Sequence, residues 1–433
     1  LRSGVQSLRW SPDGSKIAFV ANRGDHAFIG YFDIKSNKVV YVDPSIDLDS
    51  EPAWSPDGVS LAFIRSPFEK DKLLFAPKRQ GHLWSIRIHN IETGETKEFW
   101  KAQPGQGSVL YGELPVNANK LIWAKSNQLI FPWEQNGWQQ LYALDINTKK
   151  VKHLTPGEGE VENAEISPDL SVLYYTTNIG DIDRRHIWKY DFNTHHSTQM
   201  TTGNIEWSPV HTSQGLAYLY STATKPAWPA IMKNNEKAED LAKKSFPQSF
   251  PKSGLVIPTA IRITATDGMK VPAQLFIPAV NKEGDKRPAV IFLHGGSRRQ
   301  MLLGFNYGQY YSHAYALNQY FASKGYIVIS LNFRSGIGYG LNFREAQNYG
   351  ATGASEFYDV LGAGLYLKSR GDVDPDKITL WGGSYGGYLT AMALSRASDL
   401  FACGVDIHGV HDWNEGIRNF VPSYVPEKMP DFK

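Results

Sequence analysis

A repeated turn segment constrains the fold of the first half of this chain more than any other feature. Trp-Ser-Pro-Asp-Gly at residues 10–14 recurs at residues 54–58, and a weaker copy, Ile-Ser-Pro-Asp-Leu, stands at residues 166–170. Proline fixes φ and Asp-Gly tolerates a positive φ, so each segment is expected to form a turn. Apolar and polar residues alternate on both sides, as they do in half-buried strands. The first two copies are 44 residues apart, a spacing typical of four-stranded β-propeller blades.

Residues 1–246 are therefore predicted to be an all-β propeller of about five blades, with degenerate copies of the repeat at Trp123 and Trp207. The wider gap between the second copy and Trp123 predicts an insertion at residues 68–81, which are rich in Lys and Arg. Because the chain opens inside a repeat unit, we expect a partial propeller that continues before residue 1. A small complete propeller is the alternative.

Residues 247–433 have a different pattern, in which strands and helices alternate after a Pro-rich linker at residues 247–252. The predicted strands are residues 259–265, 271–277, 288–293, 327–332, 378–381 and 402–407. The predicted helices are residues 312–324, capped by Ser312, residues 355–369 and residues 385–397. This alternation predicts a doubly wound, mostly parallel sheet with helices on both faces.

The segment Trp-Gly-Gly-Ser-Tyr-Gly-Gly at residues 381–387 lies between a predicted strand and a predicted helix. Gly382, Ser384 and Gly386 satisfy the G-x-S-x-G pattern of a nucleophile elbow. Such a turn is too tight for side chains at its glycines, and it holds the serine hydroxyl out toward solvent at the positive end of the helix. The second part of the chain is therefore predicted to be an α/β-hydrolase domain with Ser384 as its nucleophile.

Acyl transfer by a serine also needs N–H donors for the oxyanion and a base with an orienting partner. His294-Gly-Gly296 follows a predicted buried strand, where α/β-hydrolases supply one oxyanion N–H, and Tyr385 follows the nucleophile and supplies the other. His294 itself is expected to be structural or to line the pocket. His408 and His411 follow the first strand after the elbow, which is too early for the triad histidine, so we expect them to be structural or to line the pocket. A role as base for either is the alternative. We expect the catalytic Asp and His beyond residue 433, so that this chain is truncated at both ends.

Composition excludes several other classes of function. The formal net charge of +2 argues against a nucleic-acid partner, and no apolar run approaches the length of a membrane span. The single cysteine, Cys403, lies in an apolar predicted strand and is expected to be buried and inert. No metal site and no cofactor are predicted. Oligomeric state stays open, and so does the compartment, cytoplasmic or periplasmic.

Four segments carry a resemblance to a known family. They are residues 292–296, 332–340, 381–387 and 409–413. Together with the Ser-Pro-Asp-Gly units they resemble the prolyl oligopeptidase family of serine peptidases, which includes dipeptidyl peptidases and acylaminoacyl peptidases. The resemblance covers essentially the whole chain. It implies that Ser384 is the nucleophile and that the N–H groups of Gly296 and Tyr385 bind the oxyanion.

The chain departs from that family at several positions. His294 stands where the prolyl oligopeptidase and dipeptidyl branches have Tyr, which is closer to the acylaminoacyl branch, whereas Ser297 replaces the usual Pro. The dipeptidyl branch binds the substrate amine with paired propeller glutamates. Glu158, Glu160 and Glu162 lie near a blade start, but we expect them to form a solvated turn.

The predicted function is a serine exo- or oligopeptidase acting on short peptides, with the propeller restricting entry. A carboxylesterase that uses the same elbow is one alternative. A propeller-based peptide-binding module with an inactive hydrolase domain is the other.

Overall fold

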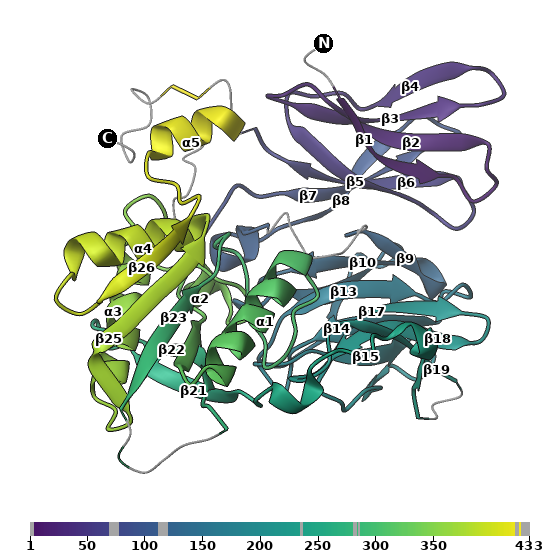
Figure 1. The fold of residues 1–433 in the computed structure, drawn as a ribbon. Coiled ribbons are helices and arrows are strands. Elements are labelled where there is room, and N and C mark those ends of the chain that lie inside the picture. The colour runs from purple at the N-terminus through teal and green to yellow at the C-terminus, as the bar shows by residue number, and fades with distance from the viewer. Residues whose placement is uncertain are drawn as a thin grey trace.

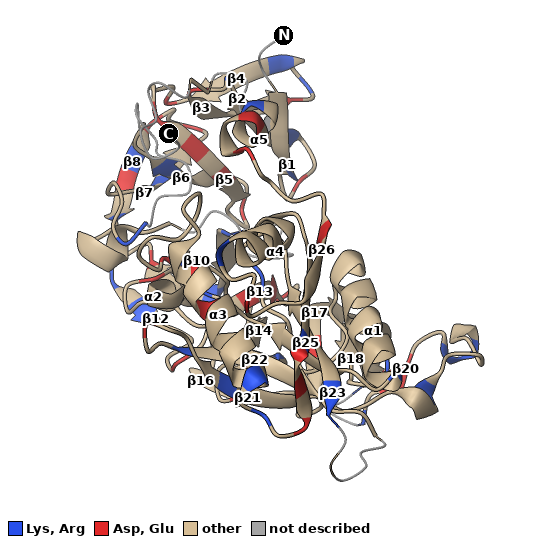
Figure 2. Cartoon of the chain, turned by 60° about the vertical axis from the view of Figure 1, so that its left-hand side comes forward, with Lys and Arg blue, Asp and Glu red and all other residues tan. Residues whose placement is uncertain are grey.

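The computed structural model describes residues 4–68, 78–110, 120–233, 237–279, 284, 286–420 and 424–425. A strand-rich N-terminal part and an α/β C-terminal part lie side by side (Figure 1). Acidic and basic residues are interspersed over both parts (Figure 2), in keeping with the formal net charge of +2. Residues 69–77, within the insertion predicted at residues 68–81, lie outside the described residues.

The described strands of the N-terminal part fall into five sets of four in which consecutive strands are antiparallel neighbours. They are β1 (Gly4–Trp10), β2 (Lys16–Asn22), β3 (Ala27–Asp33) and β4 (Lys38–Val42); β5 (Leu48–Trp54), β6 (Ser60–Ser66), β7 (Ser85–Asn90) and β8 (Thr96–Lys101); β9 (Ile122–Ala124), β10 (Gln128–Trp133), β11 (Gln140–Asp145) and β12 (Val151–His153); β13 (Val161–Ile166), β14 (Val172–Thr177), β15 (His186–Asp191) and β16 (His196–Gln199); β17 (Ile205–Thr212), β18 (Gly215–Ser221), β19 (Trp228–Met232) and β20 (Glu239–Asp240). One parallel pair, Ala27 with Leu48, joins the first two sets into an eight-stranded sheet.

This blade-like arrangement is the propeller architecture that the repeat predicts. Short 3-10 turns punctuate it at Gly105–Ser108, Lys125–Asn127, Lys243–Ser245 and Lys252–Gly254. The last two flank most of the predicted linker, residues 247–252. The number of blades and the domain boundary at residue 246 stay predictions.

Hydrogen bonds explain why Ser-Pro-Asp recurs at the turns. The Ser11 hydroxyl donates to Asp13 Oδ1 at 2.6 Å, and Ser167 donates to Asp169 Oδ1 at 2.6 Å in the third copy. In that copy Leu170 takes the left-handed conformation, with φ of 59°, that glycine provides in the other two. The repeat therefore specifies a turn between antiparallel strands that a serine–aspartate hydrogen bond stabilises.

The recurring tryptophans link neighbouring sets of strands. Trp54 Nε1 donates to the carbonyl oxygen of Arg9 at 3.0 Å, and Trp123 Nε1 donates to that of Ala53 at 3.1 Å. Each indole is buried in the apolar core of its region. The spacing of the repeat is thus the spacing at which one set of strands packs on the next.

The C-terminal part is built on a six-stranded sheet with the order β21-β22-β24-β23-β25-β26. The strands are β21 (Thr259–Thr264), β22 (Lys270–Phe276), β23 (Arg287–Leu293), β24 (Ile327–Leu331), β25 (Val373–Gly383) and β26 (Cys403–Ile407). The helices are α1 (Gln309–Ser323), α2 (Leu341–Arg344), α3 (Ala354–Lys368), α4 (Tyr385–Arg396) and α5 (Trp413–Phe420). Strands β24, β23, β25 and β26 are parallel, and the first two strands are antiparallel.

Helices cover both faces of this sheet, as predicted. One apolar core joins α1 to one face, and a second joins α3 and α4 to the other. The prediction that Ser312 caps the first helix is wrong. The helix begins one turn earlier at Gln309, because the Ser312 N–H already donates to the Gly308 carbonyl at 2.8 Å, as inside a helix.

The prediction that Cys403 is buried is also wrong, because the residue is exposed. Strand β26 is at the edge of the sheet among the described residues. Cys403, Val405 and Ile407 are on its uncovered face, whereas Gly404 and Asp406, which alternate with them, are half-buried. An apolar run predicts a strand, but it does not show which face a neighbouring element covers.

Candidate active site

The strand, turn and helix around Ser384 form the predicted elbow. Strand β25 ends at Gly383, Ser384 has φ of 56° and ψ of −119°, and α4 begins at Tyr385. A Cβ on Gly382 would lie 2.6 Å from the backbone of Gly386, and a Cβ on Gly386 would overlap the Leu293 carbonyl oxygen. Both positions therefore need glycine, as the motif predicts.

Ser384 is exposed although its two neighbours are buried. Its N–H donates to the Ile407 carbonyl at 3.0 Å, and its carbonyl accepts the Tyr388 N–H at 3.0 Å, so its backbone is fixed between β26 and α4. Within the described residues its hydroxyl makes no hydrogen bond. It stands at the N-terminal end of α4, where the helix dipole favours negative charge.

The His-Gly-Gly segment after β23 lies against the elbow. A Cβ on Gly295 would lie 3.0 Å from the Gly383 carbonyl oxygen and 3.3 Å from Ser384 Cβ. Gly296 is exposed, with φ of 121°. Backbone of this loop therefore approaches the serine closely, which is the arrangement that an oxyanion site requires.

His294 is fully buried and stacks on Phe333, with ring centroids 4.1 Å apart. Burial lowers the pKa of its imidazole to about 4, so the ring is neutral near pH 7. Its Nδ1 lies 3.0 Å from the Gly295 carbonyl oxygen. This environment fits the structural role expected for His294.

The Tyr385 side chain is hydrogen-bonded to the buried carboxyl group of Glu356, a contact that the sequence did not reveal. Its hydroxyl donates to Glu356 Oε1 at 2.6 Å, and Gly350 N–H donates to the same hydroxyl at 3.1 Å. Glu356 also accepts the hydroxyls of Ser335 at 2.9 Å and Ser355 at 2.7 Å. Burial raises the pKa of both Tyr385 and Glu356. The network fixes the first residue of α4, whose N–H is the second predicted oxyanion donor.

His408 and His411 lie in the loop after β26 and are exposed. His411 Nε2 is 2.6 Å from Asp406 Oδ2, and Asp406 Oδ1 accepts the Gly409 N–H at 2.8 Å. A histidine–carboxylate pair thus stands at the same edge of the sheet as Ser384. Within the part of the chain that the structure describes, neither histidine hydrogen-bonds to Ser384.

The expectation of a solvated turn at the three glutamates holds for Glu158, which is exposed, and is wrong for Glu160 and Glu162, which are buried. The Glu160 carboxylate accepts N–H groups of Gly338 at 2.8 Å and Gly340 at 3.0 Å, both from the α/β part. Glu162 pairs with Arg185. These partners are distant in sequence, so local composition could not reveal them.

An ion pair also joins the two parts of the protein. Arg344 on α2 donates to both carboxylate oxygens of Glu134, at 2.6 and 2.8 Å, and both residues are buried. The Leu341 N–H donates to the Gly137 carbonyl at 2.7 Å beside it. The loop and short helix after β24 are thus fixed against the N-terminal sheets.

No helix among the described residues is long and apolar enough to cross a membrane. Across the same residues, no group of three or more His, Cys, Asp or Glu side chains is arranged to hold a metal ion.

Comparisons with known proteins agree with this architecture. A model of the prolyl oligopeptidase family matches residues 312–421, and a model of the dipeptidyl peptidase IV N-terminal region matches residues 88–230. Dipeptidyl aminopeptidase BIII of Pseudoxanthomonas mexicana is 34% identical over 170 residues, which are 38% of this chain and 23% of that protein. A probable dipeptidyl-aminopeptidase B of Aspergillus clavatus is 23% identical over 407 residues, covering 88% of this chain and 42% of that protein. The matched segments therefore cover less than half the length of these two relatives.

Among solved structures, a puromycin-hydrolyzing peptidase of Mycobacterium tuberculosis superposes with a TM-score of 0.76 at 20% identity, covering 95% of this chain and 62% of that one. That likeness shows the shared fold. The two family models and the dipeptidyl aminopeptidases show in addition that both parts of this chain are similar to the prolyl oligopeptidase family of serine peptidases.

Proposed function

We propose that this protein is a serine peptidase that cleaves short peptides through an acyl-enzyme on Ser384. The observation that carries the proposal is the exposed Ser384, with its positive φ, at the start of α4 and with the His-Gly-Gly backbone against it. A serine in this position presents its hydroxyl to a substrate carbonyl while helix and loop N–H groups surround the point of attack.

In the proposed reaction, Ser384 Oγ attacks the scissile carbonyl carbon and loses its proton to a general base. The negative charge that develops on the carbonyl oxygen is stabilised by the N–H groups of Gly296 and Tyr385. Collapse of the tetrahedral intermediate breaks the C–N bond, and the protonated base returns its proton to the leaving amine. Water then hydrolyses the ester on Ser384 by the same steps.

The proposal leaves the base to be identified by experiment. His411 has the partner that an orienting carboxylate would provide, namely Asp406 at 2.6 Å. The family resemblance places the base on a later loop instead, and the His411 variant described in the Discussion distinguishes the two.

We further propose that the N-terminal sheets limit access to Ser384. The support is the set of contacts that fixes the two parts together, above all Arg344 with Glu134 and the Glu160 carboxylate with two backbone N–H groups. A rigidly attached propeller leaves a restricted path to the elbow, so short peptides should enter and folded proteins should not.

The test compares turnover of a short chromogenic peptide amide, the corresponding ester, a long unfolded chain and a folded protein. We expect cleavage of the short amide and none of the folded protein. Turnover of the ester without the amide would identify an esterase, and equal cleavage of short, long and folded substrates would remove the gating role. The Ser384→Ala variant is the negative control, and Ser323→Ala, an exposed serine at the end of α1, is the matched control.

A further inference from the structure

Two arginines, Arg298 and Arg299, follow Ser297 after the His-Gly-Gly segment, and they differ in their hydrogen-bond partners. The Arg298 guanidinium is held by hydrogen bonds within the protein. It donates to Glu345 Oε1 at 2.9 Å, to the Tyr349 hydroxyl at 2.8 Å and to the Ser335 carbonyl at 2.8 Å. Arg299 is exposed, and its guanidinium donates to the neighbouring Arg298 carbonyl at 2.8 Å and also interacts with the Tyr311 hydroxyl. Among the described residues it forms no ion pair with a carboxylate.

Arg299 borders the same glycines as the nucleophile. Its Cγ lies 3.2 Å from where a Cβ of Gly296 would be, and its guanidinium carbon lies 5.9 Å from the ring centroid of Tyr311. The Tyr311 hydroxyl lies 3.3 Å from where a Cβ of Gly295 would be, and Ser384 Cβ lies 3.3 Å from that same point. The cation and the hydroxyl are thus both beside the elbow.

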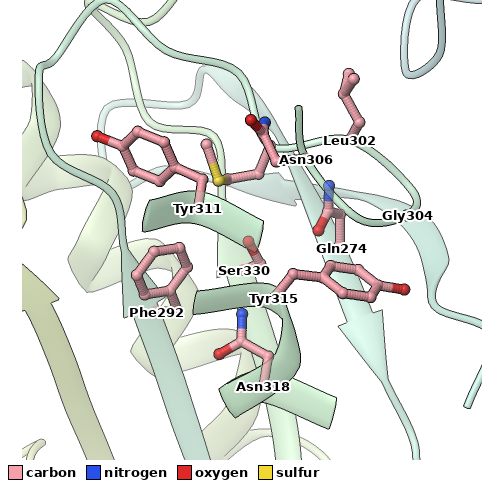
Figure 3. Close-up of a pocket in the computed structure, with 10 residues that line it drawn as sticks. Gln274, Phe292, Leu302, Gly304, Asn306, Tyr311, Tyr315, Asn318 and Ser330 are labelled. Carbon is pink, nitrogen blue, oxygen red and sulfur yellow. The ribbon is translucent and has the colours of Figure 1, made fainter. Parts of the chain in front are cut away.

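The orientation of Tyr311 fits this placement. Its ring lines a small pocket between the sheet and α1, and its hydroxyl points away from Gln274 and Ser330 on the far wall (Figure 3). The positive charge of Arg299 reaches the surrounding groups, since it helps to lower the pKa of His294 and opposes the rise that burial causes in the pKa of Tyr311. Glu162, a buried carboxylate near Tyr307, is already paired with Arg185.

An exposed guanidinium beside a nucleophilic serine is suited to bind an anion, because its planar fork matches a carboxylate. A peptide with neutral side chains carries one carboxylate, at its C-terminus, and that group is always on the leaving-group side of the scissile bond. If a guanidinium beside Ser384 binds this carboxylate, the distance between the guanidinium and Ser384 limits how many residues can lie between the scissile bond and the carboxylate.

We propose that Arg299, assisted by the Tyr311 hydroxyl, binds the C-terminal carboxylate of the leaving group, so that the enzyme prefers peptides that end shortly after the scissile bond. This inference rests on the peptidase function proposed above and adds a preference for the chemistry of the substrate end. The interaction is made before and during the reaction alike, so it acts mainly on KM.

The experiment uses pairs of peptides of one sequence with neutral side chains, ending either in a free carboxylate or in a carboxamide. The quantity measured is the ratio of kcat/KM for acid to amide. For a leaving group of one or two residues we expect a ratio of about 10 to 100 in the wild type, the size typical of a charge-assisted hydrogen bond. The ratio should fall toward one when the leaving group is lengthened to about six residues, which exceeds the reach of the site.

Three variants assign the effect. Arg299→Gln should bring the ratio for short leaving groups close to one, Arg299→Lys should keep part of it, and Tyr311→Phe should reduce it. Arg396→Gln is the matched control: it removes an exposed arginine at the far end of α4 and should leave the ratio as in the wild type.

A wild-type ratio near one, or a ratio that survives Arg299→Gln, would overturn the inference. An equal loss in Arg396→Gln would show general electrostatics instead of a site, and would also overturn it. Failure of the peptidase function looks different, because neither acid nor amide would then be cleaved and a fluorophosphonate would leave Ser384 unmodified.

Discussion

The hydroxyl of Tyr385 donates to Glu356 Oε1 at 2.6 Å, and this bond connects the first residue of the helix after the nucleophile to a carboxyl group buried under the elbow. Tyr385 and Glu356 are 2% and 0% exposed. Because solvent cannot replace the bond, it fixes the backbone N–H that we assign to the oxyanion site.

Tyr385→Phe should therefore lower both stability and activity. The variant leaves a buried carboxyl group without one of its donors, which costs about 1–3 kcal/mol, and it frees the N-terminal turn of α4. Denaturant unfolding measures the loss in the free energy of unfolding, and kcat for a short peptide measures the loss of activity. Tyr358→Phe, at a 40% exposed tyrosine on the neighbouring face of α3, should change stability by less than about 0.5 kcal/mol. Equal effects of the two substitutions would show that the buried bond has no special role.

The buried His294 predicts a pH dependence of stability. Burial lowers its pKa from the ordinary 6.5 to about 4, so the unfolded chain binds this proton first as the pH falls. The contribution of the neutral ring is complete above about pH 6.5 and is lost as the pH falls toward 4, by about 3 kcal/mol. Unfolding free energies of wild type and His294→Gln, measured from pH 7.5 to 4, should show a shallower slope for the variant. Parallel curves would mean that His294 does not titrate differently in the folded state.

The buried ion pair between Arg344 and Glu134 should contribute strongly to the stability of the contact between the two parts. Arg344→Met should destabilise the protein by about 3–5 kcal/mol, because it leaves Glu134 charged and unpaired in a buried interface. Arg370→Met breaks a partly exposed pair with Asp372, 2.7 Å long, and should cost no more than about 1 kcal/mol. Denaturant unfolding of both variants checks the contrast, and comparable losses would contradict the buried role of Arg344.

His411→Gln tests the identity of the general base. If His411 only lines the pocket, kcat should fall less than about tenfold, whereas loss of a triad base costs several orders of magnitude. Turnover of a short peptide amide is the measurement, with Asp406→Asn as its companion, since Asp406 holds His411 at 2.6 Å. A fall in both variants comparable to that of Ser384→Ala would make the His411–Asp406 pair the base and its orienting group.

Local features of this chain could be predicted from sequence because their causes are local. The elbow follows from Gly382, whose absent side chain leaves room for the backbone of Gly386 four residues later. The repeat follows from Ser-Pro-Asp, in which the serine hydroxyl bonds to the aspartate two residues later. Both are decided within a few residues.

Features that depend on distant partners could not be predicted in this way. Glu160 resembles an exposed turn residue until Gly338 and Gly340 are placed against it. Glu356 gives no sign of its bond to Tyr385, because nothing in a helical pattern names a partner on another helix. The same holds for Arg299, which forms no ion pair within the described structure, whereas the neighbouring Arg298 pairs with Glu345.

Labelling by a fluorophosphonate, followed by peptide mapping, tests the central claim most directly. The reagent captures an activated serine hydroxyl at an elbow of this kind, so we predict one adduct on Ser384, its loss in Ser384→Ala and its retention in Ser323→Ala. An adduct on another residue, or an unmodified Ser384 in protein that cleaves peptides, would contradict the assignment of Ser384 as the nucleophile.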